Sequence, residues 1–342
     1  MQRNASDPPA FDPGALLSGT ALSGTAPTVL HDASPHRRGP RPIPPGVPYH
    51  RVLAGENRRI GRGILALVLL LVGLFGFGGV LAALGSAIDE ALGRVNPIAG
   101  GTEFTPVYHA ANLLSIALMI PWSMFIQRWL YGVKGASLHS VRSMFRPAVF
   151  GRAVLTLVPI WVLYTTAFFL LSSYTEGSWR FSDLVAVFVI TLLLTPLQAA
   201  GEEYNYRGVA FRVAASWGRG PRAAMALGLA VSSILFAAIH LSTDPWLNLY
   251  YLTLGVTFGL MTWRTGGLET SVVIHAANNT LIYLIMIVTH ADPLAGSDRS
   301  AGAGSIVMLI PCVLLVAITA VIWARTRRPG PALTPQHSPS AR

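Results

Sequence analysis

Residues 64–87 read ILALVLLLVGLFGFGGVLAALGSA, a run that contains no charged side chain. A helix needs about 20 apolar residues to cross a hydrocarbon layer roughly 30 Å thick, so this run predicts a membrane-spanning helix. Further apolar runs follow at residues 107–127, 152–173, 184–204, 223–241, 246–263, 270–289 and 304–324. We therefore expect an all-α fold, a polytopic membrane helix bundle of about eight transmembrane helices.

The composition of the chain excludes an ordinary soluble protein. Of its 342 residues, 52% are hydrophobic and only 12% are charged, whereas a soluble domain carries roughly 25% charged residues. The formal charge of +10 does not indicate a nucleic-acid partner, because the cations lie between apolar runs and form no single patch. The single cysteine, Cys312, lies inside the last apolar run, so one chain can form neither a disulfide nor a thiolate metal site.

The positions of the basic residues predict the orientation of the helices, since Arg and Lys accumulate in short cytoplasmic connections. Cations are frequent before the first run and in every second connection after it: Arg51, Arg58, Arg59, Arg62; Arg128, Lys134, Arg142, Arg146, Arg152; Arg207, Arg212, Arg219, Arg222; Arg264; Arg325, Arg327, Arg328. The alternate connections hold only Arg94, Arg180 and Arg299. Both termini are thus predicted to be cytoplasmic, and the Arg-rich, Lys-poor composition favours a bacterial plasma membrane.

Three segments are predicted along the chain. Residues 1–59 contain ten prolines and an arginine cluster but no apolar run long enough for a signal peptide. They are expected to form a disordered, uncleaved cytoplasmic arm. Residues 60–326 are expected to form the transmembrane domain, with its polar motifs within residues 190–285, and residues 327–342 a disordered basic tail.

Two carboxylates and an arginine end the fourth apolar run. A charged side chain at the bilayer centre costs about 2.5 to 3.5 kcal/mol, so charges at this place need a reason. Glu203 and Arg207 are four residues apart and share one helix face, whereas Glu202 points about 100° away. We expect Arg207 to neutralise Glu203 and Glu202 to accept a proton. The alternative is an interfacial ion pair with a spare carboxylate.

Two later runs each contain a histidine one helical turn from a second notable side chain. Phe236 can pack beside His240 and fix the direction of its ring, although a simple packing or interfacial histidine is the alternative. His275 and Asn279 present an imidazole and a carboxamide on one face, while Asn278 faces elsewhere. The last pair can stabilise an oxyanion, orient a water or merely hold helices together.

Together the three groups supply what peptide hydrolysis requires. A water must lose a proton, an oxyanion must be stabilised and the leaving amine must gain a proton. Zinc is a second possibility, since Glu202, His240 and His275 with one open position would make a catalytic zinc shell. The chain has no His-Glu-x-x-His pair, so the ligands of such an ion would come from separate helices.

The order of these motifs resembles the CPBP family, the CAAX protease and bacteriocin-processing (Abi) proteins, to which the type II CAAX prenyl endopeptidases belong. The family's motifs are Glu-Glu-x-x-x-Arg, Phe-x-x-x-His and His-x-x-x-Asn or Asp. Here they read EEYNYR at 202–207, FAAIH at 236–240 and HAANN at 275–279. The resemblance covers about residues 190–285.

The resemblance implies an eight-helix intramembrane metalloprotease whose substrate is a membrane-associated or lipidated (CAAX-like) protein. Its other expected partner is the lipid bilayer, and no nucleic-acid partner is expected. Its implied catalytic residues are Glu202, Glu203, Arg207, His240, His275 and Asn279. Glu202 would activate the water, and Glu203 with Arg207 would hold that segment.

The same resemblance implies roles for the later motifs. His240 would bind the water or the metal, and His275 with Asn279 would form the side that stabilises the oxyanion. A zinc ion held by His240, His275 and Glu202 is one possibility that the resemblance implies, and a metal-independent glutamate peptidase fits the motifs equally well.

Two non-peptidase functions stay open on the sequence. One is a non-catalytic immunity or assembly factor that keeps the same scaffold. The other is a small-solute transporter, for which buried carboxylates and histidines are also expected. Transport is disfavoured because the chain has no recognisable internal repeat.

The predicted topology creates one geometric conflict. It places Glu202 near the cytoplasmic end of its run and His240 toward the opposite end of the next, about 20 Å apart at 1.5 Å of rise per residue. Either residues 204–217 fold back into the membrane as part of a longer helix, or the next helix is tilted beside a water-filled cavity.

Overall fold

The computed structural model describes residues 39–55 and 57–336. This part of the chain is helical and contains no β-strand, so the all-α prediction is confirmed. Its α-helices are α1 (Ile60–Ala91), α2 (Pro106–Ala117), α3 (Met119–Tyr131), α4 (Pro147–Leu170), α5 (Phe181–Glu203), α6 (Phe211–Trp217), α7 (Gly220–Ala238), α8 (Pro245–Thr265), α9 (Glu269–Val288) and α10 (Leu309–Arg325).

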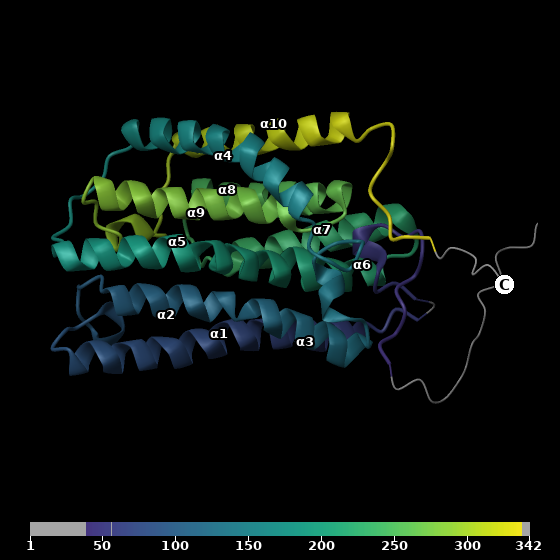
Figure 1. Ribbon diagram of the computed structural model, residues 1–342, viewed down its shortest axis with the longest axis horizontal. Helices are drawn as coiled ribbons and strands as arrows, with labels where there is room; N and C mark the ends of the chain where they lie inside the picture. The colour runs from purple at the N-terminus through teal and green to yellow at the C-terminus, as the bar shows by residue number, and fades with distance from the viewer. Residues whose placement is uncertain (1–38, 56, 337–342) are drawn as a thin grey trace, which may run out of the picture. The chain divides into compact units, whose positions relative to one another are not determined.

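The helices that carry the polar motifs lie in the interior of the bundle. As Figure 1 shows, α1 packs against α2, α2 against α5, α5 against α9, and α9 against α4. A second series runs from α6 through α7 and α8 to α10, and α8 also contacts α9. Helices α5, α7 and α9, which carry the motifs, therefore each contact more than one other helix, and such neighbours can satisfy polar side chains inside a membrane.

Seven helical segments of the described chain are long and apolar enough to cross a membrane: residues 60–91, 106–131, 147–170, 181–217, 220–238, 269–288 and 306–325. The eighth predicted span, residues 246–263, corresponds to α8, which is 21 residues long but is not in this set. Helix α8 packs between α7, α9 and α10, so it need not be as apolar as a lipid-facing helix. The protein is a multi-pass membrane protein, and its orientation stays a prediction.

Proline, short polar side chains and glycine set several helix limits. Thr105 caps α2, because its hydroxyl accepts the N–H of Tyr108 at 3.0 Å and Pro106 needs no hydrogen bond of its own. Asp244 caps α8 in the same way ahead of Pro245. Gly266 ends α8 with a φ of 71°, a left-handed conformation that favours glycine.

The conflict in the predicted depth is resolved by a longer helix. Helix α5 continues through a π-helical segment, Tyr204–Ala210, into α6, which makes one 37-residue helix from Phe181 to Trp217. The part after Glu203 adds about 20 Å at 1.5 Å per residue. Helix α7 then runs back by a similar length, which returns the chain to the level of Glu202. The first of the two predicted alternatives is the one observed.

Segments at both ends of the described chain pack against the bundle. Tyr49 is fully buried and its hydroxyl donates to the carbonyl of Leu138 at 2.7 Å. Thr334 donates through its backbone N–H to Val47 at 2.9 Å. The predicted disordered arm and tail are therefore too long where they include residues 40–55 and 327–336. The rest of both predictions, residues 1–38 and 337–342, lies outside the described residues.

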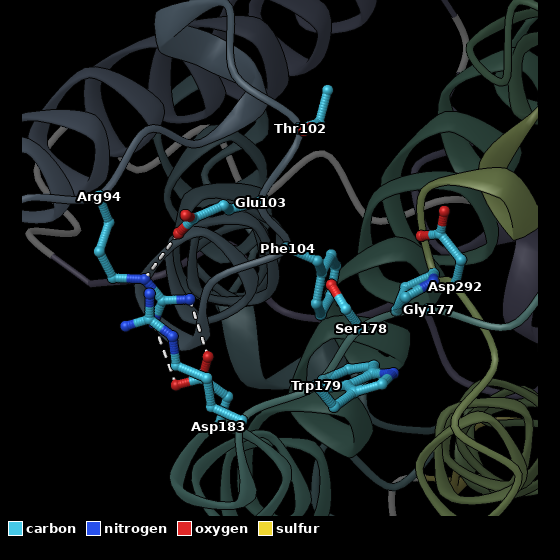
Figure 2. A pocket seen from close by; sticks show the side chains of 11 residues that line it. Arg94, Thr102, Glu103, Phe104, Gly177, Ser178, Trp179, Asp183 and Asp292 are labelled. Carbon is cyan, nitrogen blue, oxygen red and sulfur yellow. Dashed lines mark hydrogen bonds and ion pairs between the residues drawn. The ribbon is translucent and has the colours of Figure 1, made fainter.

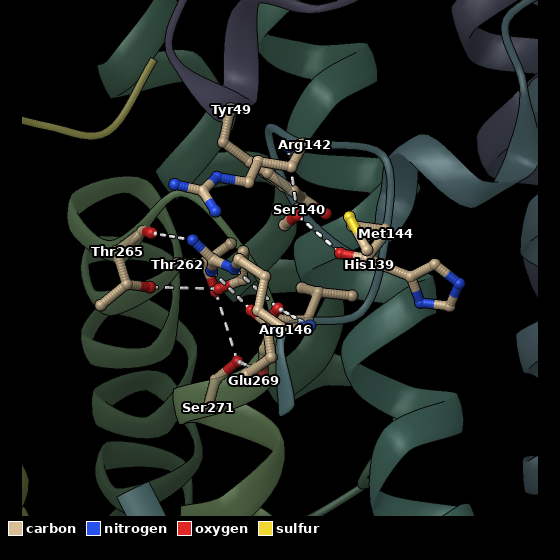
Figure 3. A network of polar contacts seen from close by, with 12 residues as sticks. Tyr49, His139, Ser140, Arg142, Met144, Arg146, Thr262, Thr265, Glu269 and Ser271 are labelled. Carbon is tan, nitrogen blue, oxygen red and sulfur yellow. Dashed lines mark hydrogen bonds and ion pairs between the residues drawn. The ribbon is translucent and has the colours of Figure 1, made fainter. Parts of the chain in front are cut away.

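A buried ion pair fixes the turn between α8 and α9 (Figure 3). Arg146 binds both carboxylate oxygens of Glu269, at 2.8 and 2.6 Å, and donates to the carbonyl of Thr265 at 2.9 Å. Gly267 lies so close to this pair that a Cβ would overlap it. In the same connection before α4, His139 contacts the hydroxyl of Tyr204 in the π-helical segment. This end of the fold therefore supports the segment that carries the two carboxylates.

Candidate active site

Glu203 and Arg207 form a buried ion pair, as the sequence predicts. Arg207 Nη1 lies 3.0 Å from Glu203 Oε1, and both side chains are almost completely inaccessible. The guanidinium also donates to the carbonyl of Leu254 at 3.0 Å and stacks over the ring of Phe236 at 4.0 Å. A buried charge with fewer contacts would be costly, so these partners explain why Arg207 is tolerated at this depth.

His275 lies between the two carboxylates. Its Nδ1 is 2.8 Å from Glu203 Oε1, and its Nε2 is 3.8 Å from Glu202 Oε2. The first distance is a hydrogen bond, whereas the second is too long for one. The imidazole thus lies among two carboxylates and, through Glu203, one guanidinium.

Glu202 has one oxygen held and one free. Its Oε1 accepts from Gln198 Nε2 at 2.5 Å. Its Oε2 is buried and has no hydrogen-bond partner within the described part of the chain, and the whole residue is 7% exposed. An unpaired carboxylate oxygen in such a place is costly and is therefore a candidate functional group.

His240 is held by aromatic rings and one backbone carbonyl. Its Nδ1 lies 2.7 Å from the carbonyl oxygen of Phe236. Its ring stacks on Tyr251 at 3.8 Å and meets Phe236 edge-on at 4.9 Å. Phe236 in turn lies 6.0 Å from the ring of His275. The predicted packing of Phe236 against His240 is thus observed, and the same ring also approaches the second histidine.

Asn279 reaches Glu202 through a residue that the motifs do not contain. Asn279 Nδ2 donates to Gln198 Oε1 at 3.0 Å, and Gln198 donates to Glu202. Asn278, which is predicted to face elsewhere, points to Trp161 and Tyr250 but also donates to Asn279 Oδ1 at 3.1 Å. The two asparagines therefore act as one hydrogen-bonded unit.

Zinc binding by His240, His275 and Glu202 stays a prediction. Within residues 39–55 and 57–336, no three His, Cys, Asp or Glu side chains converge closely enough to hold a metal ion. Both ring nitrogens of His275 face carboxylates, and Nδ1 of His240 faces a carbonyl. The donor types suit zinc, but their arrangement does not fit a three-ligand shell.

A polar cavity of about 320 Å³ lies among the connections that are predicted to be extracellular and is not lined by any of the predicted site residues (Figure 2). Arg94 crosses it to Glu103 at 2.9 Å and to Asp183 at 2.7 Å. Phe104 and Trp179 line the same cavity. Arg94 thus links the ends of α1, α2 and α5. Because it is already paired with two carboxylates, the cavity offers no obvious reacting group.

Sequence reasoning missed three neighbours of the predicted site. Gln198 lies four residues before Glu202 within an apolar run, so its spacing could have revealed it. Tyr251 and Trp161 gave no such signal, because aromatic residues are ordinary in membrane helices. Their contacts with His240 and Asn278 depend on how the helices pack.

Comparison with known proteins finds similarity in the region that contains the candidate site. Residues 181–281 match the family described as type II CAAX prenyl endopeptidase Rce1-like. The uncharacterized protein YyaK of Bacillus subtilis (strain 168) is 29% identical over 134 residues, which is 37% of this chain and 43% of that protein. The chain thus spans less than half the length of the curated relative it matches, and no solved structure gives a significant match. The matched residues run from α5 into α9 and contain all three motifs, so this region of the chain is similar to the Rce1-like type II CAAX prenyl endopeptidases.

Proposed function

We propose that the chain is an intramembrane endopeptidase that hydrolyses a peptide bond of a membrane-associated or lipidated protein. The observation that carries this proposal is the free oxygen of Glu202, buried and 3.8 Å from Nε2 of His275. One water between these atoms would contact a proton acceptor and an imidazole together. General-base chemistry needs this arrangement.

The proposed reaction uses the charge balance of the cluster. With Glu202 and Glu203 ionised and Arg207 and His275 protonated, the net charge is zero. Glu202 takes a proton from the water as the water oxygen attacks the carbonyl carbon, and the carbonyl π electrons move onto its oxygen. The Nε2–H of His275 donates to this oxyanion. When the carbon–nitrogen bond breaks, the amine takes the proton held by Glu202, which restores the carboxylate.

Two other side chains support this reaction. Asn279 uses one of its two N–H groups to bind Gln198, so the second is available for the oxyanion. His240 donates through Nδ1 to the carbonyl of Phe236, which leaves its Nε2 to accept from the water. No step in this scheme passes through a metal ion, because the donors do not converge on one.

The test is cleavage of lipidated and unlipidated peptides by the full chain in liposomes. Glu202→Gln and His275→Ala are expected to lose activity by at least about a hundredfold, as general acid–base groups do. Glu90→Gln is the matched control, since Glu90 is an exposed carboxylate on α1. Cleavage by Glu202→Gln at the wild-type rate would sink the enzymatic assignment and favour a non-catalytic scaffold.

A further inference from the structure

A chain of side-chain hydrogen bonds connects α4 to the proposed base. Trp161 Nε1 lies 3.2 Å from Asn278 Oδ1, and Asn278 Nδ2 lies 3.1 Å from Asn279 Oδ1. Asn279 Nδ2 lies 3.0 Å from Gln198 Oε1, and Gln198 Nε2 lies 2.5 Å from Glu202 Oε1. The chain thus crosses from α4 through α9 to α5.

The direction of this chain is set by the chemistry of its two ends. An indole N–H only donates, so Asn278 must present its oxygen to Trp161 and its nitrogen to Asn279. Asn279 must then present its nitrogen to the oxygen of Gln198, and Gln198 must present its nitrogen to Glu202. An ionised carboxylate only accepts, so the far end requires the same direction.

We propose that Trp161 is a positioning residue for the reaction, acting through the three amides to hold Glu202 with Oε1 bound and Oε2 facing His275. This inference rests on the proposed function. Trp161 is fully buried and lies outside the family match, in α4. The hydroxyl of Tyr250 also donates to the same Asn278 oxygen at 3.2 Å, but a hydroxyl can donate or accept and so does not fix the direction.

The alternative is that Trp161 only fills space, and the two roles predict different results. Loss of packing lowers stability without changing how the rate depends on pH. Loss of the directed chain removes an N–H that favours the ionised carboxylate, so the acid limb of the kcat/KM profile moves to higher pH.

The experiment compares Trp161→Phe, Tyr250→Phe and the double variant with wild type in liposomes, with Trp129→Phe, an exposed tryptophan of α3, as control. We expect Trp161→Phe to move the acid limb of the kcat/KM profile up by about one pH unit. At pH values below this limb, kcat/KM should then be about tenfold lower than in wild type. Tyr250→Phe should change little, and the double variant should lose more than the two single variants combined. If Trp161→Phe does not fold, Asn278→Leu interrupts the same chain.

The outcomes separate this inference from the proposed function. A wild-type pH profile in the folded double variant, or in Asn278→Leu, would show that Trp161 only packs, while an inactive Glu202→Gln would still support the peptidase. Wild-type cleavage by Glu202→Gln would contradict both the proposed peptidase function and the role of Trp161.

A second, independent feature is a groove of about 500 Å³ between α4 and α10. Apolar side chains line most of it, among them Leu157, Ile160 and Val321. Two exposed arginines, Arg152 near the start of α4 and Arg325 at the end of α10, line it at one end. Neither arginine has a carboxylate partner among the described residues.

We infer that this groove binds an anionic phospholipid, with its phosphate between Arg152 and Arg325 and an acyl chain along the apolar wall. The two arginines lie at the end that is predicted to be cytoplasmic, and basic sites between helices on that side suit anionic headgroups. Thr270 lines the same groove, and a threonine hydroxyl can donate to phosphate. A zwitterionic lipid would leave the two cations without a net counter-charge.

Native mass spectrometry of the full chain from phosphatidylglycerol and phosphatidylcholine nanodiscs tests this site. Wild type is expected to retain one phosphatidylglycerol per chain, and Arg152→Gln/Arg325→Gln to lose it. The matched control is Arg219→Gln/Arg222→Gln, which removes two exposed arginines before and at the start of α7. Equal loss in both double variants, or equal retention of phosphatidylcholine by wild type, would overturn the inference.

Discussion

Glu203 accepts a hydrogen bond from Nδ1 of His275 at 2.8 Å. The same carboxylate oxygen pairs with Arg207 at 3.0 Å. The residue beside the proposed base therefore orients the imidazole and neutralises the arginine at once. The sequence predicted only the second of these two contacts.

Glu203→Gln is expected to lower both stability and activity. It breaks a fully buried ion pair and leaves Arg207 without a counter-charge, which costs about 3 to 5 kcal/mol in comparable sites. It also weakens the contact that directs His275. Thermal denaturation in detergent and cleavage in liposomes would measure the two effects on the same preparation.

Glu202→Gln provides the contrast. Among the described residues Glu202 forms no ion pair with an arginine, so replacing it with an amide should leave the melting temperature unchanged or higher while abolishing cleavage. If Glu203→Gln melts at the wild-type temperature, the division of roles between the two carboxylates is wrong.

The sequence predicted the helical type of the fold, but it counted eight spans where seven segments of the described chain are apolar and long enough, and it ended the fourth span too early. The apolar run at residues 184–204 became a helix that ends at Trp217, because distant residues satisfy the polar side chains beyond Glu203. Arg212, for instance, is fully buried and donates to Gln127 at 3.1 Å and to Ser137 at 2.7 Å. Local hydropathy cannot detect partners so far away in the chain.

The candidate site shows the same distinction. Contacts between residues four apart on one helix, such as Glu203 with Arg207 and Phe236 with His240, followed from helical spacing. Contacts between helices, such as Trp161 with Asn278, did not. Order along the chain identified the motifs, but only packing shows which of their atoms meet.

Gly201→Ala tests the close approach of α2 to α5 beside Glu202. A Cβ at Gly201 would overlap the carbonyl oxygen of Ile116 and lie 3.3 Å from Cα of Ala117. These are backbone atoms that cannot rotate away, so we expect a loss of about 1 to 3 kcal/mol, as for other overpacked sites. Activity should fall as well, because Glu202 is the next residue.

Gly76→Ala is the matched control for this change, since nothing lies within 4 Å of a Cβ there. It should be neutral or slightly stabilising, because alanine favours helix. Differential scanning fluorimetry can compare both variants, and equal melting temperatures would contradict the predicted contact.

Acid is expected to weaken the docking of the segment before α1. Burial is the main cause that lowers the pKa of His50 to about 4, and the charges of Arg51 and Arg212 lower it further. Neither ring nitrogen has a hydrogen-bond partner among the residues that the structure describes, and the ring stacks on Phe211 with 5.5 Å between ring centroids. Below the ordinary pKa of 6.5, the unfolded chain binds a proton that the folded chain does not, so stability falls as pH decreases from 6.5 toward 4.

At pH 5 this difference amounts to about 2 kcal/mol. Replacing His50 with Leu removes the titrating group, so the variant should lose less stability than wild type between pH 7.5 and pH 5. Melting curves at both pH values measure this. Parallel losses in the two proteins would mean that His50 titrates normally.

Cleavage is expected to proceed without a bound metal ion. Nδ1 of His275 is committed to Glu203, and its Nε2 faces Glu202 at 3.8 Å. No third donor completes a shell in the part of the chain that the structure describes. Protein purified from zinc-supplemented medium should therefore contain well below one zinc per chain by elemental analysis, and dialysis against a chelator should leave its rate unchanged. Stoichiometric zinc that is lost together with activity in His240→Ala would instead mean that His240, His275 and Glu202 close around a metal in the active protein.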